Sequence, residues 1–196
     1  MTPSDAFAWI AGMSSALGIF LSIRAFGLQQ RGWLLVQAAV LAIVAARVLS
    51  GREDLGYIAG GSWLLFVRAP ALAAQRQHTL AMSYRFASAA RWGRLAGILH
   101  PFDGFAAQSQ YLLAQGEIHA GNWRRAREMF EKLRSVREYR DLAQVELWRL
   151  DRDWARIIAF VESHPELGST SLVTSYLRAL GETRQVDRML GHYARL

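Results

Sequence analysis

The side chains best suited to acid–base or metal chemistry in this chain are its histidines, and they are scattered. His100 stands before a proline at a predicted helix end, while His119, His164 and His192 lie in separate helical segments. No two histidines have the i, i+4 spacing that places two metal ligands on one helix face. Because the chain contains no cysteine, thiolate metal sites, disulfides and cysteine catalysis are excluded. We therefore predict no catalytic, cofactor-binding or metal-ligating residue, and we expect exposed or capping histidines.

A second set of candidate residues repeats along the chain. Arg94, Arg125 and Arg156 each stand two places after a tryptophan, and Gln185 takes the fourth place. Such a ladder can bind an acidic peptide or lipid headgroups, but a solvated helix face with neighbouring acids such as Glu128 is the interpretation we favour. We expect the tryptophans to be wedges between helices rather than ligand platforms.

The net charge of +7 is unevenly distributed. Residues 1–100 carry nine arginines and three acids, whereas residues 101–196 carry 14 basic and 13 acidic groups. A nucleic-acid groove needs clustered cations that neutralise phosphates, and the second half concentrates none. We therefore expect no nucleic-acid partner.

Apolar runs with few charges open the chain. They extend from Ala6 to Ile23, from Gly32 to Ala46, and from Leu55 to Gln75, the last being interrupted by Arg68 and Pro70. Spanning the hydrocarbon takes roughly 20 apolar residues. We predict transmembrane helices over about 6–25, 32–50 and 55–74, within a membrane region covering residues 1–76. For the third segment, a helix lying in the membrane surface is the alternative.

The charges that flank these runs predict an orientation. No basic residue precedes the first run, so we expect a retained anchor rather than a cleaved signal peptide. With three spans, Arg24 and Arg31 fall on the same side as the later arginines, and Arg47 and Arg52 fall opposite. The more basic side faces the cytoplasm. We expect a bacterial inner-membrane protein with its N-terminus outside and its soluble domain in the cytoplasm.

Tryptophans recur at a fixed spacing in the second half. Trp92, Trp123 and Trp154 are 31 residues apart, and Thr183 follows 29 residues later. Apolar residues stand three, six and seven places after each position, which puts them on one helical face. Each such helix follows another helical stretch, and these stretches are predicted over 104–120, 142–150 and 172–180. Because paired helices with a period near ~34 residues are typical of tetratricopeptide repeats, we predict an all-α chain in which residues 77–196 form a tetratricopeptide-like α-solenoid of helix pairs.

Several helix ends are also predicted. Asn122 and Asp153 are suited to be the N-caps of two tryptophan helices, and Asp103 is suited to cap the helix that follows His100 and Pro101. Residues 75–90 are expected to continue the third apolar helix out of the membrane.

Three short motifs carry a family resemblance. They are Leu99-His100-Pro101 with Asp103, Gly121-Asn122-Trp123, and the run from Tyr176 to Thr183. Together with the apolar first segment, they resemble the N-terminal region of some bacterial rhomboid-family intramembrane serine proteases. The resemblance implies a family in which a Gly-x-Ser-Gly serine, activated by a histidine on a membrane helix, hydrolyses a peptide bond inside the membrane.

Neither catalytic part of that family carries over to this chain. Ser62 is followed by Trp63 and Ser14 by Ser15, so both serines depart from the motif, and all histidines lie after residue 77. A serine without a base in reach is not an activated nucleophile.

We therefore expect a membrane-anchored helical-repeat interaction module without catalytic machinery, whose partners are the lipid bilayer and a protein held in the repeat groove. No small-molecule cofactor is expected. The alternative is the non-catalytic front part of a rhomboid-like protease whose active site lies outside this chain, and an end at Arg195-Leu196 within a repeat fits truncation. A transporter or channel is disfavoured, because the apolar segments hold no buried acid or histidine pair.

Overall fold

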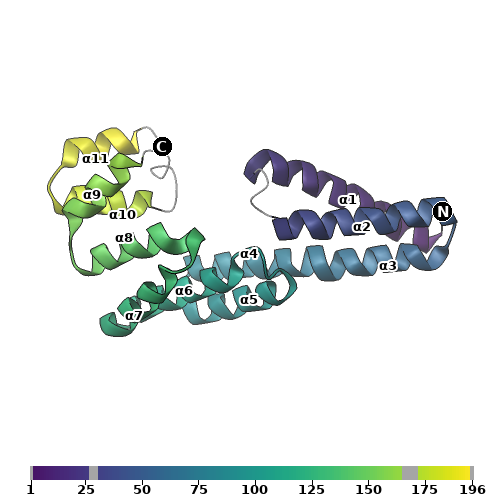
Figure 1. Ribbon diagram of the computed structural model, residues 1–196, viewed down its shortest axis with the longest axis horizontal. Coiled ribbons are helices and arrows are strands. Elements are labelled where there is room, and N and C mark those ends of the chain that lie inside the picture. Colours follow the sequence, from purple (N-terminus) through teal and green to yellow (C-terminus); the bar gives the residue numbers. More distant parts are fainter. Residues whose placement is uncertain (1, 27–30, 165–171, 195–196) are drawn as a thin grey trace. The chain divides into compact units, whose positions relative to one another are not determined.

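The computed structural model describes residues 2–26, 31–164 and 172–194, and in these ranges it is helical without strands (Figure 1). The chain divides into two compact units, Met1–Ser109 and Gln110–Leu196, each of which we describe by itself. The expected end at Arg195-Leu196 lies outside the described residues.

The first unit begins with three apolar helices. They are α1 (Pro3–Phe26), α2 (Arg31–Ser50) and one continuous helix made of α3 (Glu53–Trp63), the π-helical turn η1 (Leu64–Arg68) and α4 (Ala69–Met82). All three are long and apolar enough to cross a membrane. The predicted helices over 6–25, 32–50 and 55–74 fall within them, so the prediction of an all-helical chain with three apolar helices is confirmed.

The three-helix bundle has its apolar side chains outside and polar ones inside. Large apolar residues such as Trp9, Met13 and Leu35 are exposed, whereas Ser15 and Gln37 are buried at the helix contacts. A protein that folds in water shows the opposite distribution, because burial of apolar surface is its main driving force. The pattern is typical of helices solvated by lipid.

Small residues allow the bundle to pack closely. A Cβ added to Gly56 would lie 2.4 Å from the carbonyl oxygen of Ser4, and one added to Gly60 would lie 2.7 Å from the ring of Phe7. We expected close approach at the Gly60-Gly61 pair, and Gly60 provides it. Gly61 faces open space.

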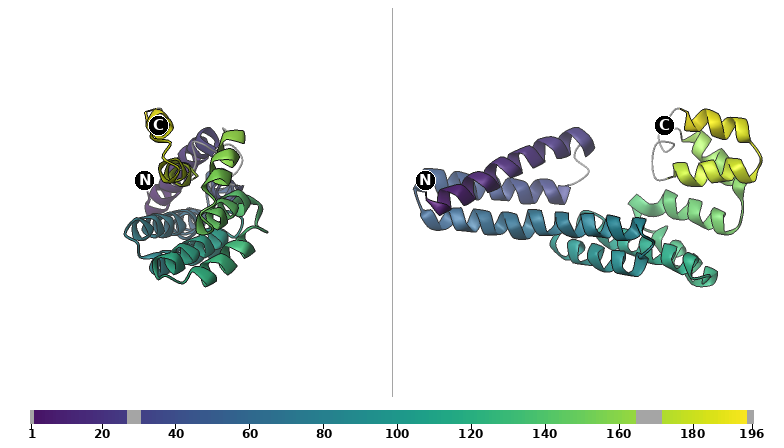
Figure 2. Two further views of the ribbon diagram at one scale, coloured as in Figure 1. Left: turned by 90° about the vertical axis from the view of Figure 1, so that its left-hand side faces the viewer. Right: turned by 180° about the vertical axis from the view of Figure 1, so that it is seen from behind.

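The continuous third helix ends earlier than expected. Residues 75–90 were predicted to form one helix, but α4 stops at Met82 and α5 (Phe86–Leu99) runs back alongside it (Figure 2). Tyr84 has φ +56° and breaks the helix in the left-handed region. The helix prediction is wrong because apolar periodicity does not mark this turn.

The second unit is a stack of shorter helices. They are α6 (Phe105–His119, which begins in the first unit), α7 (Trp123–Leu133), the 3₁₀ turn η2 (Arg137–Tyr139), α8 (Arg140–Leu150), α9 (Trp154–Ser163), α10 (Val173–Glu182) and α11 (Val186–Tyr193). A core made by Val145, Ile157, Val161 and Leu180 joins α8, α9 and α10.

The same turn joins four successive helix pairs. Its first residue has φ between +56° and +79°, the next is the N-cap of the following helix, and the N-cap N–H bonds a carbonyl five residues back. The left-handed residues are Tyr84, Gly121, Arg152 and Arg184. This combination is the Schellman motif. The tetratricopeptide-like solenoid itself stays a prediction.

The tryptophan pattern matches this turn only in part. Trp123 and Trp154 open α7 and α9, directly after the turn. Trp92, however, lies inside α5, and Thr183 follows the end of α10. The predicted core faces of α7 and α9 are buried, including Phe130 and Val161, whereas the corresponding residues of α5 and α11 remain exposed.

Candidate functional site

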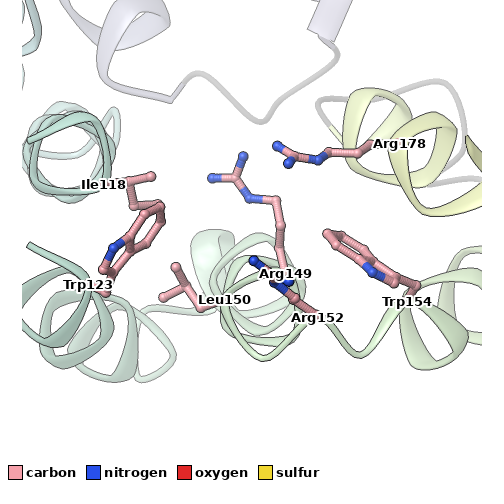
Figure 3. Close-up of a pocket in the computed structure, with 7 residues that line it drawn as sticks. All are labelled: Ile118, Trp123, Arg149, Leu150, Arg152, Trp154 and Arg178. Atoms are coloured by element: carbon pink, nitrogen blue, oxygen red, sulfur yellow. The ribbon is translucent and has the colours of Figure 1, made fainter. Parts of the chain in front are cut away.

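A cavity of about 340 Å³ in the second unit combines aromatic and cationic side chains (Figure 3). Its lining residues are Ile118, Trp123, Arg149, Leu150, Arg152, Trp154 and Arg178. The two indoles stand on opposite sides, with Arg149 and Arg152 between them. The lining contains three arginines and no acid, so it is suited to a ligand that carries negative charge beside an apolar group.

Arg149 is held in place by a closed ring of polar contacts between α6 and α8. One of its guanidinium nitrogens lies 2.5 Å from a carboxylate oxygen of Glu146 and donates to the amide oxygen of Gln115 at 3.1 Å. The Gln115 amide donates to the Tyr111 hydroxyl, and Tyr111 donates to Glu146. Because the side chains of Glu146 and Arg149 are largely buried, the ring fixes Arg149 at the cavity.

The ionisation of Tyr111 reflects this setting. Burial raises the pKa of the Tyr111 hydroxyl, and the carboxylate of Glu146 raises it further. The hydroxyl therefore stays protonated as the donor that the ring requires.

The other two cavity arginines are less constrained. The Arg178 guanidinium lies over the Trp154 ring at 5.7 Å from the centroid, and 3.7 Å from Glu182. Arg152 is exposed and has no ion pair with any residue that the structure describes. An exposed guanidinium pair beside an indole can bind a carboxylate without first losing a buried partner.

The tryptophans differ from the expected core wedges. Trp123 is 58% exposed and Trp92 is 40% exposed, so for these two the prediction is wrong. Trp154 packs partly against the core of the second unit while its ring faces the cavity. An exposed indole at a cavity edge offers a stacking or apolar surface to a ligand.

The predicted arginine ladder does not form a site. Arg125 lies 3.2 Å from Glu117, and Arg156 lies 3.2 Å from Asp153. The favoured interpretation of a solvated face with acids nearby is therefore correct for both residues, although Glu128 pairs with Arg124 instead.

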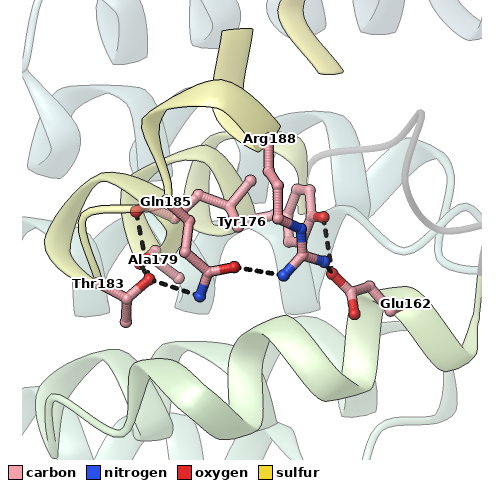
Figure 4. A network of polar contacts seen from close by, with 7 residues as sticks. Glu162, Tyr176, Ala179, Thr183, Gln185 and Arg188 are labelled. Carbon is pink, nitrogen blue, oxygen red and sulfur yellow. Dashed lines mark hydrogen bonds and ion pairs between the residues drawn. The ribbon is translucent and has the colours of Figure 1, made fainter. Parts of the chain in front are cut away.

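Gln185, the fourth member of the ladder, belongs to a local network (Figure 4). Its amide oxygen accepts from Arg188 and its amide nitrogen donates to Thr183 at 3.1 Å. Arg188 also pairs with Glu162, which accepts from the Tyr176 hydroxyl at 3.0 Å. The network ties α11 to α9 and α10 rather than presenting a ligand site.

The histidine nearest the apolar helices is buried rather than exposed. His100 occupies the C-cap of α5 and stacks on Trp33, with ring centroids 4.3 Å apart. Its Nδ1 lies 2.8 Å from an oxygen of Asp103, and its Nε2 lies 2.6 Å from the carbonyl oxygen of Phe66. Since both ring nitrogens are engaged, His100 is a structural link and not a free base.

Asp103 does not cap the helix that follows it, as was predicted. Its second carboxylate oxygen accepts from the backbone N–H of Gly32 at 3.1 Å, at the start of α2. A carboxylate is favoured there because the N-terminus of a helix carries partial positive charge. Asp153 does cap its own helix through the N–H of Arg156, whereas the Asn122 side chain bonds Glu117 instead.

Sequence reasoning missed Arg149, Arg152 and Arg178, although a signal was present. Ile118 and Arg149 are 31 residues apart, as are Trp123 and Trp154. The cavity is thus lined by residues at the same period that the tryptophans defined. Among the described residues, no cluster of three or more His, Asp or Glu side chains could hold a metal ion.

Comparisons with protein-family models, with curated proteins and with solved structures gave no match for this chain.

Proposed function

We propose that this chain is a membrane-anchored helical-repeat interaction module whose second unit binds an acidic segment of a protein partner in the Trp123–Trp154 cavity. The observation that carries the proposal is the cavity lining, which holds three arginines and two indoles without an acid. Tryptophan and arginine are the residues that most often dominate binding energy at protein interfaces. A partner segment that presents a carboxylate beside an apolar side chain satisfies both kinds of group.

The three apolar helices support the anchor. Their outward apolar and inward polar side chains are those of a bundle in lipid. At one end lie Asp5 and Arg47, whose ion pair measures 2.9 Å, and at the other lies the more basic end with Arg24, Arg31 and Arg68. The basic end supports a cytoplasmic location for the second unit in a bacterial inner membrane, with the N-terminus outside.

A site-specific photo-crosslinker tests the cavity. A benzoylphenylalanine placed at Trp123, at the edge of the cavity, is compared with one at Arg124, its exposed neighbour outside the lining. We expect a crosslinked protein only from position 123, with the attached peptide rich in Asp or Glu. Adding Arg152→Glu and Arg178→Glu should reduce the crosslink by roughly tenfold or more. Equal crosslinking from both positions, or no effect of charge reversal, would contradict the proposal.

Orientation is tested with single cysteines, since the chain has none of its own. Ser50→Cys lies at the end of α2 and Ser83→Cys lies in the turn after α4, both exposed. An impermeant maleimide should label position 50 in intact cells and position 83 only after the membrane is opened. The reverse pattern would overturn the proposed topology, and release of the chain by an alkaline wash would overturn the anchor.

The protease alternative has no supporting contact in the described part of the chain. His100, the buried histidine of the first unit, bonds a backbone carbonyl and a carboxylate through its two nitrogens. The interaction module is therefore the function that the geometry supports best.

A further inference from the structure

The segment that follows the apolar helices is basic and free of acids. Between Leu55 and Phe102 the chain contains five arginines and no Asp or Glu. The arginines are Arg68, Arg76, Arg85, Arg91 and Arg94. Such a segment attracts anions without competition from internal carboxylates.

Three of these arginines surround one cavity between α4 and α5. The cavity measures about 300 Å³ and is lined by Arg76, Leu80, Arg85, Ser88, Arg91, Trp92 and Leu95. Arg91 donates to the Ser88 hydroxyl at 3.2 Å, and none of the three arginines has an ion pair with a residue in the described ranges. The cavity therefore concentrates cationic charge beside an indole and two leucines.

One face of α5 continues this cavity as an uncovered apolar surface. Leu95 is exposed, Ile98 is 75% exposed and Phe102 is 79% exposed. The periodicity of the sequence predicted that Leu95 and Ile98 would be core residues. In the first unit, α5 instead buries Ala89, Ala90, Gly93 and Ala96, so its large apolar side chains point away from the protein.

The antiparallel packing of α4 and α5 gives the levels of these groups along the third apolar helix. Ala96 shares a buried cluster with Ala73, and Gly93 faces Gln77 so closely that an added Cβ would lie 2.5 Å from the amide. Ile98 and Phe102 are therefore level with the end of the predicted span near residue 74. Trp92, Arg91 and Arg76 lie one to two turns further out, at a rise of about 1.5 Å per residue.

Apolar side chains, then an indole, then arginines is the order of groups across a bilayer surface, from acyl chains to phosphates. We propose that the α4–α5 cavity binds the headgroup of an anionic phospholipid, with Arg76 and Arg91 on the phosphate and Ile98 and Phe102 among the acyl chains. The inference rests on the proposed membrane anchor and adds a specific lipid site to it.

The test uses the full chain reconstituted into phosphatidylcholine nanodiscs. The discs contain a minor fraction of either brominated phosphatidylglycerol or brominated phosphatidylcholine, because bromine quenches nearby indoles. The signal from Trp92 is the difference between the wild-type chain and Trp92→Phe. We expect stronger quenching by the anionic lipid, and a loss of its enrichment of roughly fivefold for each arginine removed in Arg76→Gln and Arg91→Gln. The matched control is Arg124→Gln with Arg125→Gln on α7, whose arginines pair with acids.

The outcomes separate this site from the anchor. Equal quenching by the two lipids would overturn the headgroup site while leaving the anchor in place, and absence of quenching by either would overturn contact of α5 with the bilayer. Inorganic phosphate added at millimolar concentration should not reduce the preference; if it does, the site binds a soluble anion and the lipid assignment is wrong. A chain that does not enter the discs contradicts the anchor itself.

Discussion

His100 Nε2 lies 2.6 Å from the carbonyl oxygen of Phe66. In a regular α-helix that oxygen accepts from the N–H of residue 70, and residue 70 is a buried proline without an N–H. The helix adjusts through the π-turn η1, in which the N–H of Ala69 bonds the carbonyl of Leu64. The imidazole thus supplies a donor to a backbone acceptor that the proline deprives of one.

This relationship predicts a coupling between the two side chains. His100→Ala leaves the Phe66 carbonyl and the Asp103 carboxylate without their partner, so we expect a loss of about 2 kcal/mol or more of unfolding free energy. In a Pro70→Ala background the new N–H provides a substitute donor, and the cost of removing His100 should fall by about 1 kcal/mol. Chemical unfolding of the detergent-solubilised chain measures both costs. His78→Ala, on the exposed side of α4, is the control, and equal costs in the two backgrounds would contradict the mechanism.

Adjacent glycines in α3 should respond oppositely to the same change. Gly60→Leu places a side chain against the ring of Phe7, where even a Cβ would lie at 2.7 Å. We expect a loss of about 1–3 kcal/mol through overpacking of α1 against α3. Gly61→Leu points into open space, so its stability should equal or exceed that of the wild type. Thermal unfolding in detergent compares them, and similar losses in the two variants would show that the α1–α3 contact is incorrect.

The apolar helices could be predicted from the sequence because a bilayer demands length and apolar composition, and both are read directly from the residues. The end of the third helix could not. Its turn at Tyr84 depends on a left-handed backbone, and nothing about a tyrosine in an apolar segment announces one.

The repeat was only partly predictable for a related reason. The recurring unit is a backbone turn whose left-handed position is taken by Tyr84, Gly121, Arg152 and Arg184, so residue type does not mark it. The tryptophan spacing coincides with the turn at Trp123 and Trp154 only. The cavity arginines were missed because Arg149 and Arg178 meet through the packing of helices that are distant in sequence.

The second unit should weaken at alkaline pH. Burial, with a further contribution from Glu138, raises the pKa of Tyr139 to about 12 from its usual 10.0. Between these values the folded chain holds a proton that the unfolded chain has released, so the unfolding free energy falls as pH rises from 10 towards about 12. Tyr139→Phe should reduce this fall, whereas Tyr193→Phe, which alters an exposed ring, should not. Urea midpoints on the two sides of this range provide the measurement, and an unchanged slope in Tyr139→Phe would contradict the assignment.

The left-handed turns offer a stabilising substitution. Arg184 has φ +59° and Gly121 has φ +79°, and both positions occupy the same place in the turn between paired helices. An L side chain costs roughly 1 kcal/mol in that region, and glycine avoids the cost. Arg184→Gly should therefore raise the Tm, Arg184→Ala should leave it nearly unchanged, and Gly121→Ala should lower it. Because Arg184→Gly and Arg184→Ala both remove the guanidinium, the difference between them isolates the backbone effect. Equal Tm values for those two variants would mean that the turn does not hold residue 184 in the left-handed region.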